Sequence, residues 1–465
     1  MKNELLEKMI NSKKNLIVSG NIASGKTSRV IFPIVDSLIN KKESIFVVDS
    51  KEEYINKYYD TLKNNNYNIV ILNLRDIDKS ESWNPFAYPY KLYKNGEQDK
   101  SQEYIEKVGR TLFYEDTKTN DPFWSITASD FMTGVTLGLF EDGLENEVNF
   151  NSVNNMFNGI DEKYGTKDYI TEYFNLKSNA SASYIHASTT FLAPKDTKGS
   201  ILSVARQKLR LYVSREKLSK FLNITSFKYE DITNKPTAIF FIGKDENKSL
   251  NSIVAMFIEQ LYSYLFDNGL KVKMSFILDN LDTIEKVNNL SDMMSSCLSK
   301  GMKFIISTRS NDDLKEKYGS YIEKLADTLE IKNSSILLNI NGEVLKEENN
   351  LMMDENYNFN INNNIEYPTL KDVKIDIFDL KTFVNDARKN VLINNTTNPF
   401  NIDPFGSEPF SNKDLVPFEG GGSNIDNLIK NIDKKLEELE QEEYKDIKTN
   451  INKSESELAK LKIDD

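Results

Sequence analysis

The sequence predicts an α/β fold in which a mostly parallel sheet is interrupted by an all-helical insertion. Short apolar runs of strand length alternate with helical patterns over residues 16–74, an order typical of parallel sheets with helices on both faces. Helical periodicity then dominates over residues 99–198, where strand patterns are scarce. Strand-length runs return over residues 237–339. We therefore expect a sheet domain in two pieces, with a helical domain inserted between them.

The individual elements follow from the apolar runs and their spacing. In the first piece we predict strands at 16–19, 44–49 and 68–74, and helices at 28–40 and 51–64. A helix at 200–212 should lead back to the sheet. The second piece then has predicted strands at 237–242, 274–279, 304–307 and 335–339, with helices at 249–266, 287–299 and 311–318.

A glycine-rich loop directly follows the first predicted strand. Residues Gly20–Thr27 read G-x-x-x-x-G-K-T, and the glycines let successive backbone N–H groups face phosphate oxygens beside the positive end of a helix. In this motif Lys26 reaches the β- and γ-phosphates, and the Thr27 hydroxyl binds Mg²⁺. We therefore expect ATP and Mg²⁺ to be bound here. The binding residues would be Gly20, Asn21, Ile22, Ala23, Ser24, Gly25, Lys26, Thr27 and Ser28.

A second acidic position completes such a site. The apolar run at 274–278 ends in Asp279, which should hold the water shell of the magnesium ion together with Thr27. Hydrolytic relatives carry Glu at the next position, where this chain has Asn280, and an amide is a poor general base. Asp282 is the candidate replacement. The predicted catalytic residues are Lys26, Asp279 and Asp282, and hydrolysis itself stays open.

The predicted strand at 304–307 should end beside Asp279. A polar side chain at that point would detect the γ-phosphate, and Thr308 and Arg309 are the two candidates. The alternative for Arg309 is a surface or intersubunit salt bridge.

Composition favours a globular protein of a reducing compartment. The 465 residues include one cysteine and one histidine, which excludes an intramolecular disulfide and makes a zinc site improbable. No apolar run reaches the roughly 18–20 residues that span a bilayer. The net charge is −12, but 15 basic and 26 acidic residues lie beyond residue 340, so the body is almost neutral. A basic face on the body is therefore compatible with the acidic total.

We expect five segments along the chain. Residues 1–98 form the first part of the nucleotide-binding domain, 99–198 the all-α domain, 199–340 the second part of the nucleotide-binding domain, 341–422 a flexible linker, and 423–465 an acidic amphipathic helix. The last segment suits either a partner-binding helix or a solvated single helix.

Several motifs in this order resemble the TraG/TraD-type coupling proteins of type IV secretion and conjugation. The family shows D-P-K-G-E where this chain has Asp49-Ser50-Lys51-Glu52-Glu53, so the first, third and fifth residues match. Further resemblance lies in Trp83-Asn84-Pro85-Phe86, Asp121-Pro122-Phe123-Trp124, Gly199-Ser200-Ile201, Leu314–Gly319 and Asp403-Pro404-Phe405. The resemblance covers roughly residues 14–340. It implies a RecA-like P-loop ATPase with an inserted all-α domain, in which Asp49 or Glu53 supports the loop.

The resemblance also implies partners and a place of action. It implies a coupling protein that recruits a DNA–relaxase substrate to a secretion channel, binds DNA without sequence preference, and assembles as a hexamer. The family's N-terminal membrane segment does not precede the first predicted strand. We therefore expect a cytoplasmic protein at the inner face of the membrane, held there by partners such as a separate membrane-anchor subunit. Because of Asn280, a weakly hydrolytic or non-hydrolytic scaffold of the same machinery is the alternative function.

Overall fold

The structure is a computed structural model, and it describes residues 3–113, 122–243, 250–332, 335–340, 342–348 and 361–397. Residues Met1–Asn390 form one compact unit and Val391–Asp465 a second. The predicted acidic helix at 423–465 lies outside the described residues.

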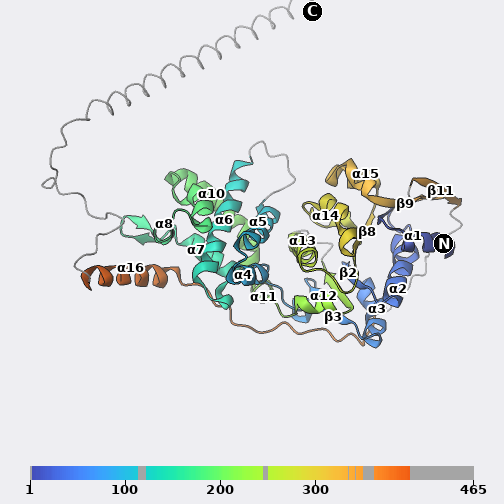
Figure 1. Ribbon diagram of the computed structural model, residues 1–465, viewed down its shortest axis with the longest axis horizontal. Coiled ribbons are helices and arrows are strands. Elements are labelled where there is room, and N and C mark those ends of the chain that lie inside the picture. Colours follow the sequence, from blue (N-terminus) through green and yellow to red (C-terminus); the bar gives the residue numbers. More distant parts are fainter. Residues whose placement is uncertain are drawn as a thin grey trace, which may run out of the picture. The chain divides into compact units, whose positions relative to one another are not determined.

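The nucleotide domain contains a nine-stranded sheet with the order β11-β10-β9-β1-β8-β7-β2-β6-β3. Figure 1 labels β2, β3, β8, β9 and β11 of this sheet. All pairs from β9 to β3 are parallel, whereas β10 and β11 are added antiparallel at the β9 edge. The strands are β1 (Asn15–Gly20), β2 (Ser44–Val48), β3 (Asn68–Asn73), β6 (Thr237–Ile242), β7 (Met274–Leu278), β8 (Met302–Thr308), β9 (Ala326–Lys332), β10 (Ser335–Ile340) and β11 (Glu343–Glu348). The seven predicted strands are all present, and the predicted α/β fold is confirmed.

Two strands of this sheet, β9 and β11, were not predicted. β9 mixes polar and apolar residues (Ala-Asp-Thr-Leu-Glu-Ile-Lys), and β11, the edge strand, has only two apolar residues, Val344 and Leu345. Their apolar content is too low to stand out as a run. β9 nevertheless extends along the whole of β1, the strand that carries the phosphate-binding motif.

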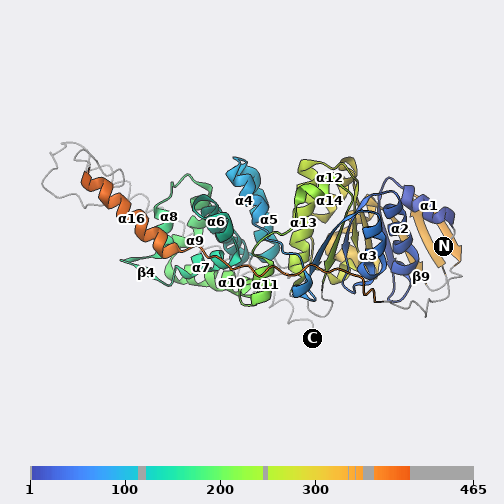
Figure 2. The same cartoon turned by 90° about the horizontal axis from the view of Figure 1, so that it is seen from below.

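Alternate residues of the strands enter two separate cores. Val18, Ile45 and Val47 pack in the core beneath α1 (Asn3–Asn11), α2 (Phe32–Asn40) and α3 (Glu53–Asn64). Ile17 and Phe46, one position away, pack in the opposite core with α13 (Asn251–Asn268) and α14 (Leu290–Ser296). Figure 2 shows α2 and α3 together along one side of the strands. Helices therefore cover both faces, which leaves the strand ends as the accessible edges.

The helix after the phosphate loop begins earlier than the predicted residue 28. A wide, π-helical turn spans Lys26–Ile31 and continues directly into α2. The change to α-helical geometry falls next to Pro33, which has no amide hydrogen to donate to the preceding turn. The first helical residues therefore belong to the loop motif itself.

A helical region separates β3 from β6 in the chain. It comprises α4 (Ala87–Lys94), α5 (Gln98–Phe113), α6 (Phe123–Asp142), α7 (Phe150–Asn158), α8 (Tyr169–Asn175), α9 (Ala182–Phe191), α10 (Lys195–Val213), α11 (Glu216–Phe221) and α12 (Tyr229–Asn234), with a short β4–β5 ribbon (Lys163–Tyr164 and Lys167–Asp168). Helix α6 is buried on nearly all sides against α5, α9 and α10. α9 approaches it so closely that a Cβ on Gly134 would lie 2.5 Å from the Ala187 nitrogen. Helix α10 packs on α6 and α7, so the predicted boundary at residue 198 falls inside a helix of this region.

The predicted flexible linker at 341–422 contains ordered structure in its described part. It includes β11 and α16 (Leu380–Thr397), and the side chains of Phe378, Leu380 and Val384 are buried. Residues 361–379 run along the body without regular structure. Asn362 bonds to Asn56 and Asp60 of α3, the Leu370 amide donates to Asp78, and the Phe378 amide donates to Ser152 of α7. The polar composition of this segment predicts a flexible linker, but its residues form hydrogen bonds with the body of the protein.

In the described ranges, no helix combines the length and the apolar character that crossing a lipid bilayer requires.

Candidate functional site

The carboxyl ends of four parallel strands meet at one edge of the sheet. β1 lies beside β8, β8 beside β7, and β7 beside β2. Leu278 pairs with Ile306 on one side and with Val48 on the other, so the residues that follow these three strand positions are level with one another. The phosphate loop leaves the end of β1 at the same edge. Open α/β sheets bind ligands outside these strand ends.

Two glycines give the phosphate loop its shape. Gly25 has φ +81°, a left-handed conformation that side chains disfavour. Gly20 lies against the neighbouring strand β9: a Cβ there would lie 2.8 Å from the Ser24 Oγ and 3.1 Å from the Ile331 carbonyl oxygen. Glycine is therefore required at the first position because a side chain would meet neighbouring atoms. It is required at the second because the backbone is left-handed there.

The Lys26 side chain folds back onto its own loop. Its Nζ donates to the carbonyl oxygens of Gly20 (2.6 Å) and Asn21 (3.1 Å), and only 6% of the residue is exposed. Burial lowers the pKa of the Lys26 ammonium, while the carboxylates of Asp279 and Asp282 act in the opposite direction. A buried cation held only by neutral carbonyl groups is stabilised when an anion takes their place.

Asp279 is the centre of the polar contacts beneath the loop. Its Oδ2 accepts hydrogen bonds from the Thr27 hydroxyl (2.9 Å) and the Tyr54 hydroxyl (2.9 Å), and its Oδ1 accepts one from the Ser307 hydroxyl. These partners come from the loop, from α3 and from the end of β8. The predicted pair Thr27 and Asp279 is thus in direct contact.

Two of these partners, Tyr54 and Ser307, are absent from the predicted site. Ser307 ends the apolar run of β8, and strand register places it level with Asp279. The predicted sensor positions lie one and two residues beyond it. Thr308 is buried, and its hydroxyl donates to the Ser310 carbonyl oxygen (3.1 Å). Its role as a sensor of the γ-phosphate stays a prediction.

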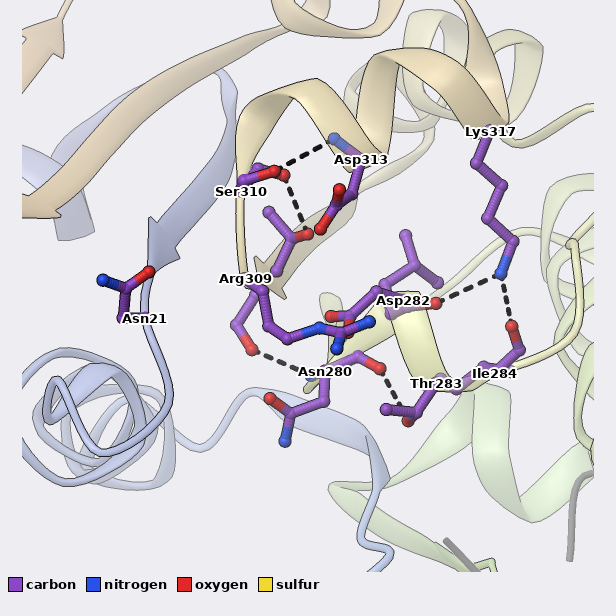
Figure 3. A network of polar contacts seen from close by, with 12 residues as sticks. Asn21, Asn280, Asp282, Thr283, Ile284, Arg309, Ser310, Asp313 and Lys317 are labelled. Atoms are coloured by element: carbon purple, nitrogen blue, oxygen red, sulfur yellow. Dashed lines mark hydrogen bonds and ion pairs between the residues drawn. The ribbon is translucent and has the colours of Figure 1, made fainter.

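The chain turns sharply at Asn280 (Figure 3). Asn280 has φ +53° and ψ +53°, and its amide donates to the Ser307 hydroxyl (2.8 Å). Its carbonyl accepts hydrogen bonds from the Thr283 amide and hydroxyl, both at 2.8 Å. Asn tolerates the left-handed region better than Glu does, because its short polar side chain bonds locally. The turn therefore gives a backbone reason for Asn at the position where hydrolytic relatives have Glu.

Asp282 and Arg309 form an ion pair across this turn (Figure 3). The Asp282 side chain is 6% exposed and the Arg309 side chain 52% exposed. Arg309 reaches Asp282 from the loop after β8. One of the two alternatives for Arg309, a salt bridge, is therefore formed within the chain itself.

The acidic residues after β2 take different positions. Asp49 is buried, and its Oδ2 accepts the amides of Tyr54 (3.1 Å) and Ile55 (2.9 Å), which fixes the start of α3. Burial raises the pKa of Asp49 to about 7 although both amides act against the rise. Glu53, the first residue of α3, is half-buried and faces the loop.

A cavity of about 370 Å³ lies at the strand ends, and Asp279, Tyr54 and Ser307 are not part of its lining. Its lining includes most of the predicted binding residues, from Ile22 to Ser28, together with the candidate Asp282. Gly20 and Asn21 contribute instead through their carbonyl contacts with Lys26. The lining also includes Lys51, Glu53, Asn280, Thr283 and Arg309.

A known protein family and several solved structures are similar to this chain. The family described as Type IV secretory system Conjugative DNA transfer matches residues 9–344 of the chain. No curated protein matches the chain.

Solved structures of a bacterial conjugative coupling protein share the fold. The structure of TrwBdeltaN70 in an unbound monoclinic form has a TM-score of 0.52 at 12% identity, over 72% of this chain and 77% of that one. TrwB in complex with the ATP analogue ADPNP has a TM-score of 0.53 at 13% identity, over 79% and 86%. TrwB in complex with ADP and Mg²⁺ gives 0.52 at 13% identity over the same shares. At this identity the likeness establishes the fold. Because the family match covers well over half of the sequence, the chain belongs to the conjugative DNA transfer family of the type IV secretory system.

Proposed function

We propose that the protein is an ATP-binding coupling protein that recruits a DNA–protein substrate to a type IV secretion channel and drives its transfer by ATP hydrolysis. One observation carries the proposal: the Thr27 hydroxyl of the phosphate loop is hydrogen-bonded to Asp279 at the end of β7. In P-loop enzymes this pair of oxygens lies at the magnesium ion. Family membership supports the conjugative setting.

The residues present suit ATP and Mg²⁺. The loop amides from Ile22 to Ser28 and the Lys26 ammonium would hold the phosphates, and Thr27 and Asp279 would hold the ion and its water shell. Oxygen ligands of this kind are those that Mg²⁺ prefers. The bound ion would neutralise charge that develops on the phosphates. TrwB, which shares the fold, has been solved with ADPNP and with ADP and Mg²⁺.

Membership of the conjugative DNA transfer family suggests the partners. We propose that the protein acts as a hexamer at the inner face of the membrane, with channel subunits and a separate membrane-anchor subunit, and binds DNA through phosphates. Contacts of that kind ignore base sequence, so DNA affinity should fall steeply with salt.

A transfer assay tests this function. Cells that carry a conjugative element without this gene are complemented with the wild type or with Lys26→Ala, and transconjugants are counted. We expect the wild type to restore transfer and Lys26→Ala to lower it at least 100-fold, since loss of the phosphate-binding charge removes ATP use. Transfer at the wild-type frequency with Lys26→Ala would contradict an ATP-driven role.

A second function is favoured by Asn280, which occupies the position of the usual hydrolytic Glu. In that case the protein binds ATP with little or no turnover and acts as a scaffold of the same machinery. The two functions differ in one quantity, the turnover number for ATP, measured with and without DNA.

A further inference from the structure

If the protein hydrolyses ATP, a group other than residue 280 must take the proton of the attacking water. The Asn280 amide cannot serve, and its left-handed conformation disfavours Glu at this position. Among the described residues that line the cavity, Glu53 and Asp282 are the two carboxylates.

Asp282 is already engaged. Its buried carboxylate forms the ion pair with Arg309. Asp282 follows a turn in which the Asn280 amide donates to the Ser307 hydroxyl and the Thr283 hydroxyl donates to the Asn280 carbonyl. Protonation of Asp282 would neutralise the charge that binds the Arg309 guanidinium, at a site where only 6% of the Asp282 side chain meets solvent. Breaking a buried charge pair is costly.

Glu53 is placed beside the metal-site carboxylate by two independent constraints. Strand pairing sets Val48 level with Leu278, so the chain leaves β2 next to the point where Asp279 leaves β7. The residue after Glu53 is Tyr54, whose hydroxyl contacts Asp279 directly. The amides that follow Glu53 are anchored by buried Asp49. These contacts fix the first turn of α3, with Glu53 in the cavity lining.

We propose that Glu53 is the general base of ATP hydrolysis in this chain, an inference that rests on the function proposed above. The Glu53 carboxylate accepts a proton from water as the water oxygen forms a bond to the γ-phosphorus. The bond between the γ-phosphorus and the β,γ-bridging oxygen breaks, and its electron pair leaves with ADP. The proton on Glu53 then passes to solvent, and inorganic phosphate is released.

The test compares three variants of the full chain that each remove one carboxylate charge. Glu53→Gln preserves size, Asp282→Asn removes the rival base, and Glu52→Gln is the matched control. Glu52 lies next in sequence, faces Arg75 and Tyr367 instead, and is absent from the cavity lining. For each protein we would measure the kcat of ATP hydrolysis and the Kd of a fluorescent ATP analogue.

We expect Glu53→Gln to lower kcat at least 100-fold with the analogue Kd within about threefold of the wild type, because general bases contribute about 10²–10⁴-fold. Glu52→Gln, which lies outside the cavity lining, should keep kcat within about fivefold. Asp282→Asn should lower kcat less than Glu53→Gln does. Glu53→Asp, which keeps the charge on a shorter side chain, should recover part of the lost rate if Glu53 acts chemically.

Two results would overturn the assignment. The first is a wild-type rate in Glu53→Gln; the second is loss of turnover in Asp282→Asn while Glu53→Gln retains it. A wild-type protein that binds the analogue but never hydrolyses ATP would instead contradict the ATP-driven function, and the proposal with it. The variants therefore test the role of Glu53, whereas the wild-type rate tests ATP hydrolysis itself.

Discussion

The Tyr54 hydroxyl donates a 2.9 Å hydrogen bond to the same carboxylate oxygen of Asp279 that accepts the Thr27 hydroxyl. Tyr54 and Asp279 are 225 residues apart in sequence, and both are buried. Burial, first, and the Asp279 charge, second, raise the pKa of Tyr54 well above its usual range. Tyr54 therefore stays protonated and acts as a permanent donor that orients Asp279.

Removal of this donor should affect both stability and metal use. We expect Tyr54→Phe to lower the free energy of unfolding by about 1–2 kcal/mol, since a hydrogen bond to a charged group is lost while Asp279 keeps Thr27 and Ser307. The Mg²⁺ concentration for half-maximal nucleotide binding should rise several-fold. Tyr59→Phe, in the same helix but away from Asp279, is the control for urea unfolding and Mg²⁺ titration. Equal Mg²⁺ dependence in the two variants would contradict the role of Tyr54.

The raised pKa of buried Asp49 should make the free energy of unfolding depend on pH. Its pKa rises from 3.8 in the unfolded chain to about 7 in the folded protein, so between these values the folded state binds a proton that the unfolded state has released. This contribution is fully present below pH 4, is lost as pH rises to about 7, and is constant above that.

Urea unfolding at pH 4.5 and pH 8 measures this effect. Asp49→Asn should gain stability relative to the wild type across that window by an amount on the order of 3 kcal/mol. The exposed Asp36 provides the control Asp36→Asn. An identical pH profile for wild type and Asp49→Asn would show that Asp49 does not titrate in this range.

The second glycine of the loop motif, Gly25, can be compared with a glycine outside the site. Gly25 and Gly96 both have positive φ, +81° and +90°, so alanine strains the backbone by about 1–2 kcal/mol at each. A Cβ on Gly25 would lie 2.8 Å from the Arg29 side chain, whereas a Cβ on Gly96 would have no neighbouring heavy atom within 4 Å. Isothermal titration should show at least tenfold weaker nucleotide binding for Gly25→Ala alone. Equal losses of affinity would mean that the loop shape is not what binds the phosphates.

The pair Asp282 and Arg309 lends itself to a double-mutant cycle. We expect Arg309→Ala to cost about 2 kcal/mol of stability, because a buried carboxylate loses its partner. The coupling with Asp282→Asn should be about 1 kcal/mol, discounted because the Arg309 side chain is half-exposed. Additive effects in urea unfolding would exclude the ion pair in solution.

Local sequence patterns were sufficient for the parts of the site that lie on one continuous segment. The loop at Gly20–Thr27 was predictable because strand, turn and helix occur together in sequence. Asp279 was predictable because a short apolar run ends in an acid. Both signals depend on near neighbours alone.

The remaining partners depend on long-range pairing that sequence periodicity does not contain. Ser307 meets Asp279 because strand register is fixed only when β7 and β8 pair. Tyr54 reaches the site through the rotation of α3, which Asp49 sets through its amide contacts. Residues 361–379 suggest a linker because they lack periodicity, yet their hydrogen bonds are made with distant elements of the body.

The most direct test of the account is the steady-state rate of Mg²⁺-dependent ATP hydrolysis by the full chain, with and without single-stranded DNA. Lys26→Ala serves as the inactive reference, and Lys13→Ala, an exposed lysine before β1, as the charge control. We predict turnover by the wild type and by Lys13→Ala that requires Mg²⁺ and is lost with Lys26→Ala. Tight ATP binding by the wild type with no turnover under any of these conditions would contradict the central claim.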